Sequence, residues 1–140
     1  MFIVPDPPRE TNGLDSHLMY LSSPLSTYKT PRYARMLAYC RAALPDAEIL
    51  EPKHLFHSST DWRAKWPDVL GRIDQLVFFH DADPDWVGAG VIREIHDTFE
   101  LGKSICYLDD GGQLHPFEAV RFEFPEDATI AKLARVRMRK

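Results

Sequence analysis

The sequence predicts an α/β fold in which one mostly parallel sheet carries helices on both of its faces. The segment Gln75–Phe79 shows the first reason, because it is a continuous apolar run of the kind found in strands that are covered on both sides. Runs of this kind alternate along the chain with longer segments of helical character. We therefore expect a single, doubly wound sheet of the Rossmann-like or flavodoxin-like type.

Size and composition bound the architecture and the class of protein. The chain has 140 residues, of which 44% are hydrophobic and 27% charged, and this fits one soluble domain. Residues 1–16 are rich in proline and polar side chains, so we expect a tail before a domain spanning 17–140. The net charge of −4 argues against a general nucleic-acid surface. No membrane-spanning run or secretory signal is visible, so we expect a cytoplasmic protein.

The chain's first strand and helix have clear boundaries. His17–Leu21 is a short apolar run and predicts a buried strand, which ends in the polar loop Ser22-Ser23-Pro24. Thr30 and Pro31 predict the start of a helix, with threonine as its cap and proline at its first position. This helix is expected to end near Leu44, before a Pro-Asp pair.

The next segments predict a second strand, a second helix and the strongest strand of the sheet. Ala47–Leu50 is expected to be a strand, and a loop follows it from Glu51 to Thr60. The stretch 61–72 predicts a helix that Pro67 shortens or kinks. The apolar run Gln75–Phe79 is then the central strand.

The second half of the chain continues the alternation. A helix is expected from Trp86 to Gly102, since Val87, Val91, Ile95 and Phe99 recur every four residues. A buried strand is expected at 104–108 and an edge strand at 119–124. A final helix is expected from Pro125 onward, with a basic end.

Glu94 stands out within the helix expected from Trp86 to Gly102. Gly90 lies one turn before it, and residues four apart on a helix are neighbours. The missing side chain leaves open space beside the carboxylate, although a glycine inside a helix costs roughly 1 kcal/mol relative to alanine. Gly88 is a second such glycine. We therefore expect an accessible carboxylate in a ligand pocket; the alternative is a tightly packed helix with Glu94 merely solvated.

Polar residues follow three of the expected strands. Ser22-Ser23, the loop Asp81–Asp85 and the pair Asp109-Asp110 each come directly after an apolar run. In open α/β sheets, ligands bind outside the carboxyl ends of the strands. These loops are expected to surround the start of the helix that carries Glu94.

Three motifs in order along the chain carry a family resemblance. Tyr20–Leu25 has a tyrosine, an apolar residue, two small residues and a proline; Ile73–Phe78 is an apolar strand entered with an aspartate; Gly90–Ile95 contains the glutamate and precedes Leu101-Gly-Lys103. Together they resemble the nucleoside 2-deoxyribosyltransferase-like superfamily, which includes deoxyribosyltransferases and deoxynucleoside 5′-monophosphate N-glycosidases. The resemblance spans about residues 19–108.

The resemblance implies cleavage or transfer at the N-glycosidic bond of a nucleoside or its 5′-monophosphate. Glu94 would attack the anomeric carbon, and water or another base would then resolve the sugar ester. A second acid must protonate the departing base, and the candidates are Asp74 or a carboxylate of the Asp81–Asp85 loop. Asp74 could equally cap a strand or a turn. No cofactor and no metal are expected.

The chain departs from the family pattern around the glutamate. Members usually have aspartate or serine six residues before it, where this chain has Gly88; that side chain helps to hold the sugar or to orient the nucleophile. Asp85 could take its place if the loop folds back. Arg93 and His96 stand where members are commonly apolar or small. The alternative function is therefore a non-catalytic nucleotide-binding or interaction domain with a degenerate site.

Substrate binding is assigned to the residues around these motifs: Tyr20, Ser22, Ser23, Ser26, Gly88 and Gly90. The serines precede a helix N-terminus, where free N–H groups and the helix dipole favour an anion such as a phosphate. Arg32 and Arg35 add positive charge on the first turns of that helix. The alternative is a polar capping loop with surface arginines.

Other reactive or aromatic residues are expected in the core. Cys40 and Cys106 lie in apolar segments, which favours core thiols over a disulfide, a metal site or a nucleophile. Trp62 and Trp66 are four apart and predict one apolar helix face, although an aromatic ring near the pocket could stack on a base.

The expected partner is a small-molecule nucleoside or nucleotide, with no membrane and no nucleic acid. The resemblance implies a homodimer or higher homo-oligomer in which a neighbouring subunit helps to close the site. The segments Asp61–Trp66 and Phe117–Phe124 support this, because they carry more large apolar residues than a solvated edge needs. Both segments could instead complete the core of the monomer.

Overall fold

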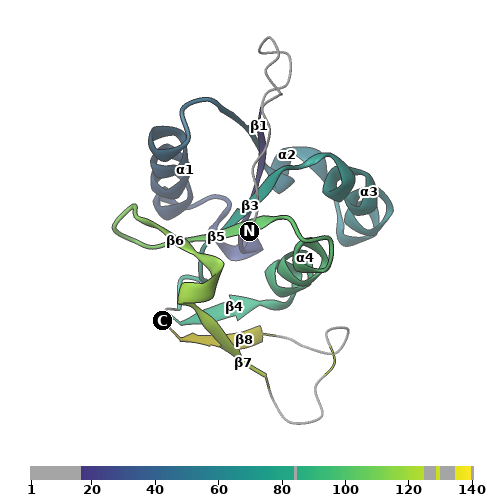
Figure 1. The fold of residues 1–140 in the computed structure, drawn as a ribbon. Coiled ribbons are helices and arrows are strands. Elements are labelled where there is room, and N and C mark those ends of the chain that lie inside the picture. The colour runs from purple at the N-terminus through teal and green to yellow at the C-terminus, as the bar shows by residue number, and fades with distance from the viewer. Residues whose placement is uncertain (1–16, 84, 125–128, 130–134, 140) are drawn as a thin grey trace.

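The computed structural model describes residues 17–83, 85–124, 129 and 135–139, and it confirms the α/β fold (Figure 1). A five-stranded sheet has the order β2-β1-β3-β5-β6. Its first four strands are parallel, and β6 is antiparallel to β5. The strands are β1 His17–Ser22, β2 Ala47–Leu50, β3 Gln75–Phe78, β5 Ser104–Leu108 and β6 Leu114–Pro116.

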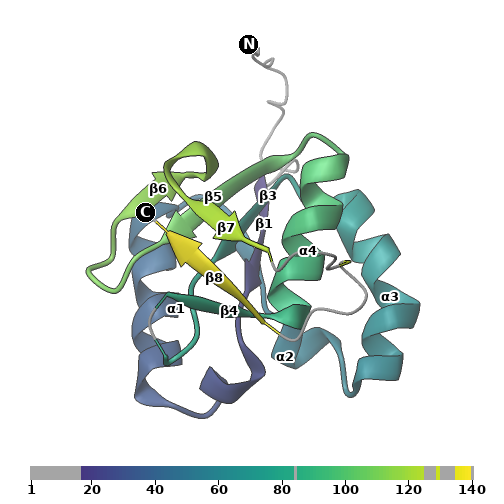
Figure 2. The same ribbon diagram turned by 90° about the horizontal axis from the view of Figure 1, so that it is seen from below.

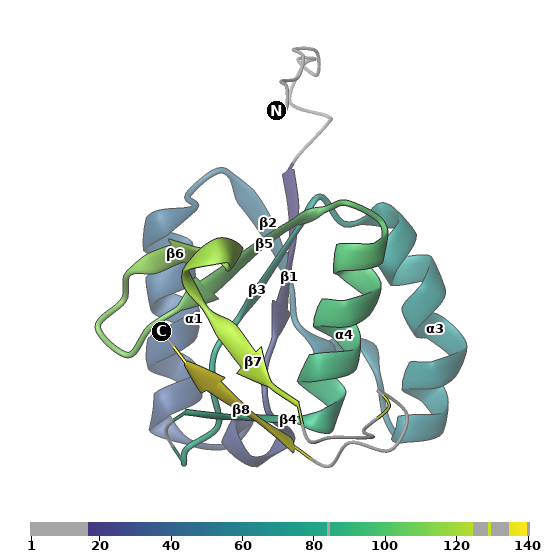
Figure 3. The ribbon, with the colours of Figure 1, turned by 60° about the horizontal axis from the view of Figure 1, so that its bottom comes forward.

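Helices cover both faces of this sheet. They are α1 Pro31–Ala43, α2 Pro52–Leu55, α3 Ser59–Arg72 and α4 Ala89–Glu100. Helix α1 lies on one face and α3 and α4 lie on the other (Figures 1 and 3). Two of these helices begin at a capping side chain. Thr30 accepts a hydrogen bond from Tyr33 N at the start of α1, and Ser58 accepts one from Asp61 N at the start of α3. Pro67 lies inside α3 without ending it.

The two layers follow from the alternation of side chains along each strand. Met19 and Leu21 of β1 pack with Met36 of α1 in one buried cluster. Tyr20 points to the other face, where its ring centroid lies 4.9 Å from that of Trp66 on α3. The even-numbered residues of β1 therefore face the side of the sheet that carries α3 and α4.

A second, three-stranded antiparallel sheet, which the sequence analysis did not predict, packs beside α4 (Figure 2). Its strands, in the order β4-β8-β7, are β4 Trp86–Gly88, β8 Arg135–Arg139 and β7 Arg121–Glu123. Val87, Val136 and Met138 are buried and join this sheet to the core. We refer to it below as the small sheet.

The small sheet corrects several predicted elements. Helix α4 begins at Ala89 rather than at Trp86, because Val87 pairs with Val136 in a strand. The predicted edge strand at 119–124 is β7 and belongs to the small sheet. The end of the predicted final helix is strand β8; the rest of that helix, apart from residue 129, lies outside the described residues, as does the tail 1–16.

Some predicted details differ in other ways. Phe99, predicted on the buried stripe of α4, is 58% exposed, because α4 ends at the following residue. The expected loop between β2 and α3 contains the short helix α2. Trp66 is buried, and Trp62, Phe117 and Phe122 pack against the same core cluster. No helix in the described part of the chain has the length and apolarity needed to cross a membrane.

Candidate active site

Glu94 is a buried carboxylate on α4 and is held by three donors. The Tyr20 hydroxyl donates to Oε2, and so does the Trp62 indole N–H, at 2.8 Å. The Ser22 hydroxyl donates to Oε1 at 2.6 Å. Tyr20 and Ser22 are two residues apart on β1 and therefore project to the same face of the sheet, toward α4. Both carboxylate oxygens are thus fixed in place.

The carboxylate lies at the topological switch point of the sheet. Strand β1 sits between β2 and β3, so the chain leaves β1 toward one edge of the sheet and then crosses to the other. Crevices outside the carboxyl ends of strands at such points are the usual ligand sites of open α/β sheets. Ser22 is the last residue of β1, which places Glu94 at this end of the strand.

Burial dominates the electrostatics of Glu94. It raises the pKa of the carboxyl to about 7, against the lowering effect of the bonds from Ser22, Tyr20 and Trp62; the charge of Asp97 raises it further. Burial, together with the neighbouring Glu94, also raises the pKa of the Tyr20 hydroxyl. Tyr20 therefore stays a neutral donor while Glu94 changes its charge near neutral pH.

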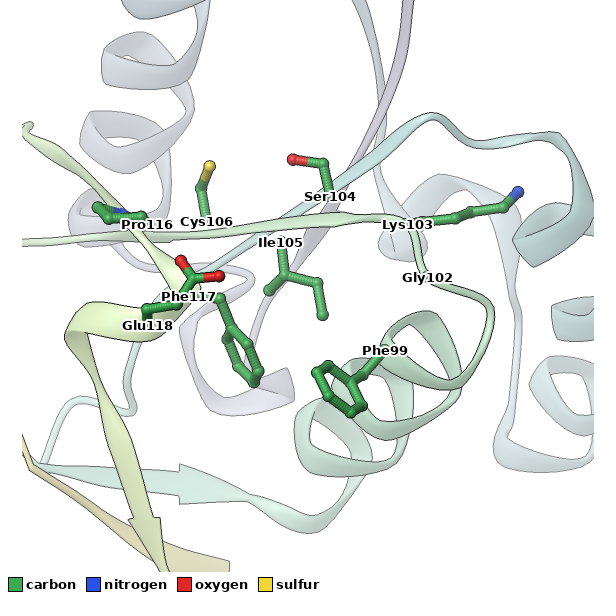
Figure 4. A pocket seen from close by; sticks show the side chains of 9 residues that line it. All are labelled: Phe99, Gly102, Lys103, Ser104, Ile105, Cys106, Pro116, Phe117 and Glu118. Atoms are coloured by element: carbon green, nitrogen blue, oxygen red, sulfur yellow. The ribbon is translucent and has the colours of Figure 1, made fainter. Parts of the chain in front are cut away.

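Access to Glu94 differs from the expectation of an open carboxylate, because the residue is 5% exposed. A side chain at Gly90 would meet no atom within 4 Å, so there is open space at that position on α4. A cavity of about 430 Å³ lies elsewhere, between the end of α4, the start of β5 and the turn Phe117–Ala119 (Figure 4). Phe99, Lys103 and Phe117 are among its lining residues.

Asp81 places a second carboxyl group at the start of α4. A Cβ atom at Gly88 would lie 3.8 Å from Asp81 Oδ1, so this carboxyl borders Gly88, the residue that precedes α4. Asp81 Oδ1 is buried and has no hydrogen-bond partner among the described residues. Burial raises the pKa of Asp81, while a bond from the Gly88 backbone and the charge of Arg135 oppose the rise.

The other two predicted catalytic carboxylates lie in different surroundings. Asp74 precedes β3 and accepts a 2.8 Å hydrogen bond from Leu18 N at the beginning of β1. It therefore caps the opposite end of β1 from Glu94, as the alternative interpretation proposed. Asp85 lies in the turn before β4 with φ 70°, and its carbonyl accepts a bond from Met138 N.

The serines of the predicted binding loop differ in their surroundings. Ser23 is buried, and its hydroxyl donates to Leu21 O at 3.4 Å. Ser26 is exposed in the turn Leu25–Thr27. Of the three serines, Ser22 is the one that contacts Glu94.

A paired cluster borders the serine loop at the same edge of the sheet. Arg32, near the start of α1, donates from Nε to Asp110 Oδ1 at 3.0 Å and contacts His80 through Nη2. His80 Nε2 also contacts Asp110, at 3.0 Å. Burial opposes ionisation of Asp110, but Arg32 and His80 together hold its pKa below the usual range. The charge of Arg32 is thus already paired, which weakens the expectation that it binds a phosphate.

The role of Trp62 and the position of Asp81 were not predicted from the sequence. Trp62 was expected in the core, yet its N–H bonds Glu94, while Trp66 donates to Asp97 at 2.9 Å. Both cysteines are free thiols. Among the described residues, no group of three or more histidine, cysteine or acidic side chains is placed to hold a metal ion.

Comparisons with family models, with curated proteins and with solved structures give no match to this chain. The fold and the site define an α/β protein with a buried glutamate, whose pKa is raised to about 7, at the switch point of its sheet. Its activity is therefore a proposal drawn from the chemistry of that site.

Proposed function

We propose that this protein cleaves or transfers the N-glycosidic bond of a deoxynucleoside or its 5′-monophosphate, with Glu94 as the nucleophile. The observation that carries the proposal is the set of donors from Tyr20, Ser22 and Trp62 on one buried carboxylate at the switch point. Such an arrangement holds an attacking oxygen in a fixed direction. The family resemblance of the motifs around Tyr20 and Glu94 implies the same chemistry.

The proposed reaction has two steps. A Glu94 oxygen forms a bond to C1′ of the sugar while the bond from C1′ to the base nitrogen breaks, and its electron pair leaves with the base. The developing charge on the sugar is oxocarbenium-like, and an ionised carboxylate stabilises it. Water then cleaves the sugar ester, or the nitrogen of a second base attacks C1′ and completes a transfer.

Asp81 is the proposed acid that protonates the departing base. Burial raises its pKa, which shifts the carboxyl toward the protonated form relative to an ordinary aspartate, and its buried Oδ1 has no hydrogen-bond partner within the described part of the chain. Its carboxyl also lies beside Gly88, where the family has a polar side chain. Asp81 is one of the carboxylates of the Asp81–Asp85 loop that were expected to supply this acid, and the substrate would approach over Gly90.

Release of free base tests the proposal. Deoxynucleosides and their 5′-monophosphates are incubated with the wild-type protein, with Glu94→Gln and with Glu100→Gln, and the products are separated by chromatography. We expect Glu94→Gln to lower turnover by about a thousandfold or more. Glu100→Gln, an exposed change on the same helix, should leave turnover unchanged. Equal turnover in all three proteins would exclude Glu94 as the nucleophile.

A non-catalytic nucleotide-binding or interaction domain is the second candidate function. Gly88 favours it, because the family's polar side chain is absent there, and so does the burial of Glu94. This candidate predicts that a nucleoside monophosphate raises the melting temperature without any release of base. Product analysis on the same samples separates the two functions.

We also propose that the protein forms a homo-oligomer. Phe99, Leu101 and Phe124 are each more than half exposed, and exposed apolar side chains commonly mark interfaces. The segment Asp61–Trp66 offers less support than expected, since Trp66 completes the core. Light scattering at micromolar concentration should give a mass above 16.1 kDa; a mass equal to that of one chain would contradict the proposal.

A further inference from the structure

The outer face of the small sheet concentrates positive charge. Along β8, Val136 and Met138 are buried, while Arg135 and Arg139 are exposed and Arg137 is half-buried. Side chains alternate along a strand, so the three arginines project to one face and the two apolar residues to the core. Figure 3 shows β8 and β7 on the outside of the molecule, in front of the main sheet.

The neighbouring strands extend this face. Arg121 of β7 is paired with Arg139, and Trp86 of β4 is paired with Arg137. Directly paired residues of antiparallel strands share a face, so the indole and a fourth arginine join the three arginines of β8. Glu123 is the one acidic residue in these three strands. The chain as a whole carries a net charge of −4, so the positive charge is local.

These arginine side chains are held in position by weak contacts with Trp86 and by exposed ion pairs. The guanidinium carbons of Arg135 and Arg137 lie 4.1 and 5.8 Å from the centre of the Trp86 ring. Arg139 pairs with Glu123 at 2.9 Å and Arg135 with Asp83 at 3.3 Å, and all four of these side chains are about half exposed. Exposed ion pairs of this kind are weak and exchange readily with other anions.

We propose that this face binds single-stranded nucleic acid. Residues two apart on a strand lie about 6.8 Å from each other, which is close to the separation of successive phosphates in an extended single strand. Arginine side chains contact phosphates in pairs of hydrogen bonds and also stack on bases, as the Trp86 ring can. No nucleic-acid partner was expected because of the net charge of −4, and the basic residues near the end of the chain were predicted to lie on a helix. As a strand, β8 lines them up on one surface.

Fluorescence anisotropy with a labelled single-stranded oligonucleotide of about 12 nucleotides, titrated at several salt concentrations, tests this proposal. Each neutralised phosphate contributes about −0.7 to the slope of log K against log salt concentration, so four arginines predict a slope of about −3. Arg121→Gln combined with Arg139→Gln should weaken binding about tenfold or more and make the slope less negative by about 1.4. The assay measures no turnover and is independent of Glu94.

The control removes the same charge from elsewhere on the surface. Arg41 and Arg63 are exposed on α1 and α3, and Arg41→Gln combined with Arg63→Gln should leave affinity and slope unchanged. Circular dichroism confirms that each variant is folded. Equal weakening by both double variants would overturn the proposal, because binding would then follow net charge alone. Absence of binding at about 20 mM salt would also overturn it, as would binding to anionic vesicles but not to the oligonucleotide.

Discussion

Replacement of Glu94 by glutamine should change how stability depends on pH. Burial raises the pKa of the folded carboxyl from the ordinary 4.5 to about 7. Between these two values the folded chain keeps a proton that the unfolded chain releases. The stabilising effect of that proton is complete below pH 4.5 and is lost as the pH rises through 7.

The size of the effect follows from the shift. One pKa unit corresponds to about 1.4 kcal/mol, so the shift of Glu94 corresponds to about 3 kcal/mol between the two limits. Glutamine cannot ionise, yet it preserves most of the contacts. The side-chain oxygen of glutamine can accept hydrogen bonds from Tyr20 and Trp62. Its NH2 group can donate a hydrogen bond to the Ser22 hydroxyl, because a hydroxyl oxygen can accept as well as donate. The variant should therefore lack this pH dependence and keep the fold.

Urea unfolding at pH 5, 6, 7 and 8 provides the measurement. The other titrating groups are common to both proteins, so the difference in the free energy of unfolding isolates Glu94. We expect the wild type to lose most of about 3 kcal/mol relative to Glu94→Gln as the pH rises from 5 to 8. Parallel curves for the two proteins would refute the reasoning, because the carboxyl would then titrate as an exposed one.

Two further substitutions test individual contacts, each against a matched control. Trp62→Phe removes a hydrogen-bond donor to the Glu94 carboxylate and should therefore raise the pKa of Glu94 above its wild-type value. The pH midpoint of the stability difference should then move upward. Trp66→Phe is the control and should move this midpoint less, because the Trp66 N–H donates to Asp97. Gly112→Ala should cost about 3 kcal/mol in urea unfolding, since φ is 90° and the new Cβ would lie 2.8 Å from the Tyr39 ring. Gly102→Ala, with φ 70° and no atom within 4 Å, should cost about 1 kcal/mol; equal costs would contradict this account.

The four parallel strands of the main sheet were predictable because they are short, mostly apolar runs, whereas the antiparallel strand β6 was not predicted. Ala47–Leu50 and Ser104–Leu108 have the predicted bounds, and β1 and β3 each differ by one residue. Buried strands carry their signal locally, in hydrophobicity and in the polar loops that end them. The prediction of helices on both faces followed from the same alternation.

The small sheet was missed because its evidence lies far apart in the sequence. Val87 fits a helical stripe with Val91 as well as it fits a strand, and only its pairing with Val136 decides between the two. The alternation of arginine with Val136 and Met138 is a strand pattern that the sequence analysis did not use.

The candidate site was predictable in Glu94 and in its neighbours Tyr20 and Ser22, but not in the contact from Trp62 or the position of Asp81. The spacing of Gly90 and Glu94 and the family resemblance identified the glutamate. The contact from Trp62 depends on how α3 packs against α4, and the position of Asp81 depends on the turn before β4. Neither can be predicted from the spacing of residues along the chain.

The pairing order within the small sheet has a consequence for folding. Strand β8 is the central strand, so β4 and β7 have no hydrogen-bonded neighbour in this sheet until β8 arrives. Closing the loop of about fifty residues between β4 and β8 is slow relative to local contacts. Gly88, which borders Asp81, is paired with Arg135 and lies at the end of β4. The part of the site around Asp81 and Gly88 is therefore expected to reach its final geometry late in folding, after the main sheet and its helices have formed.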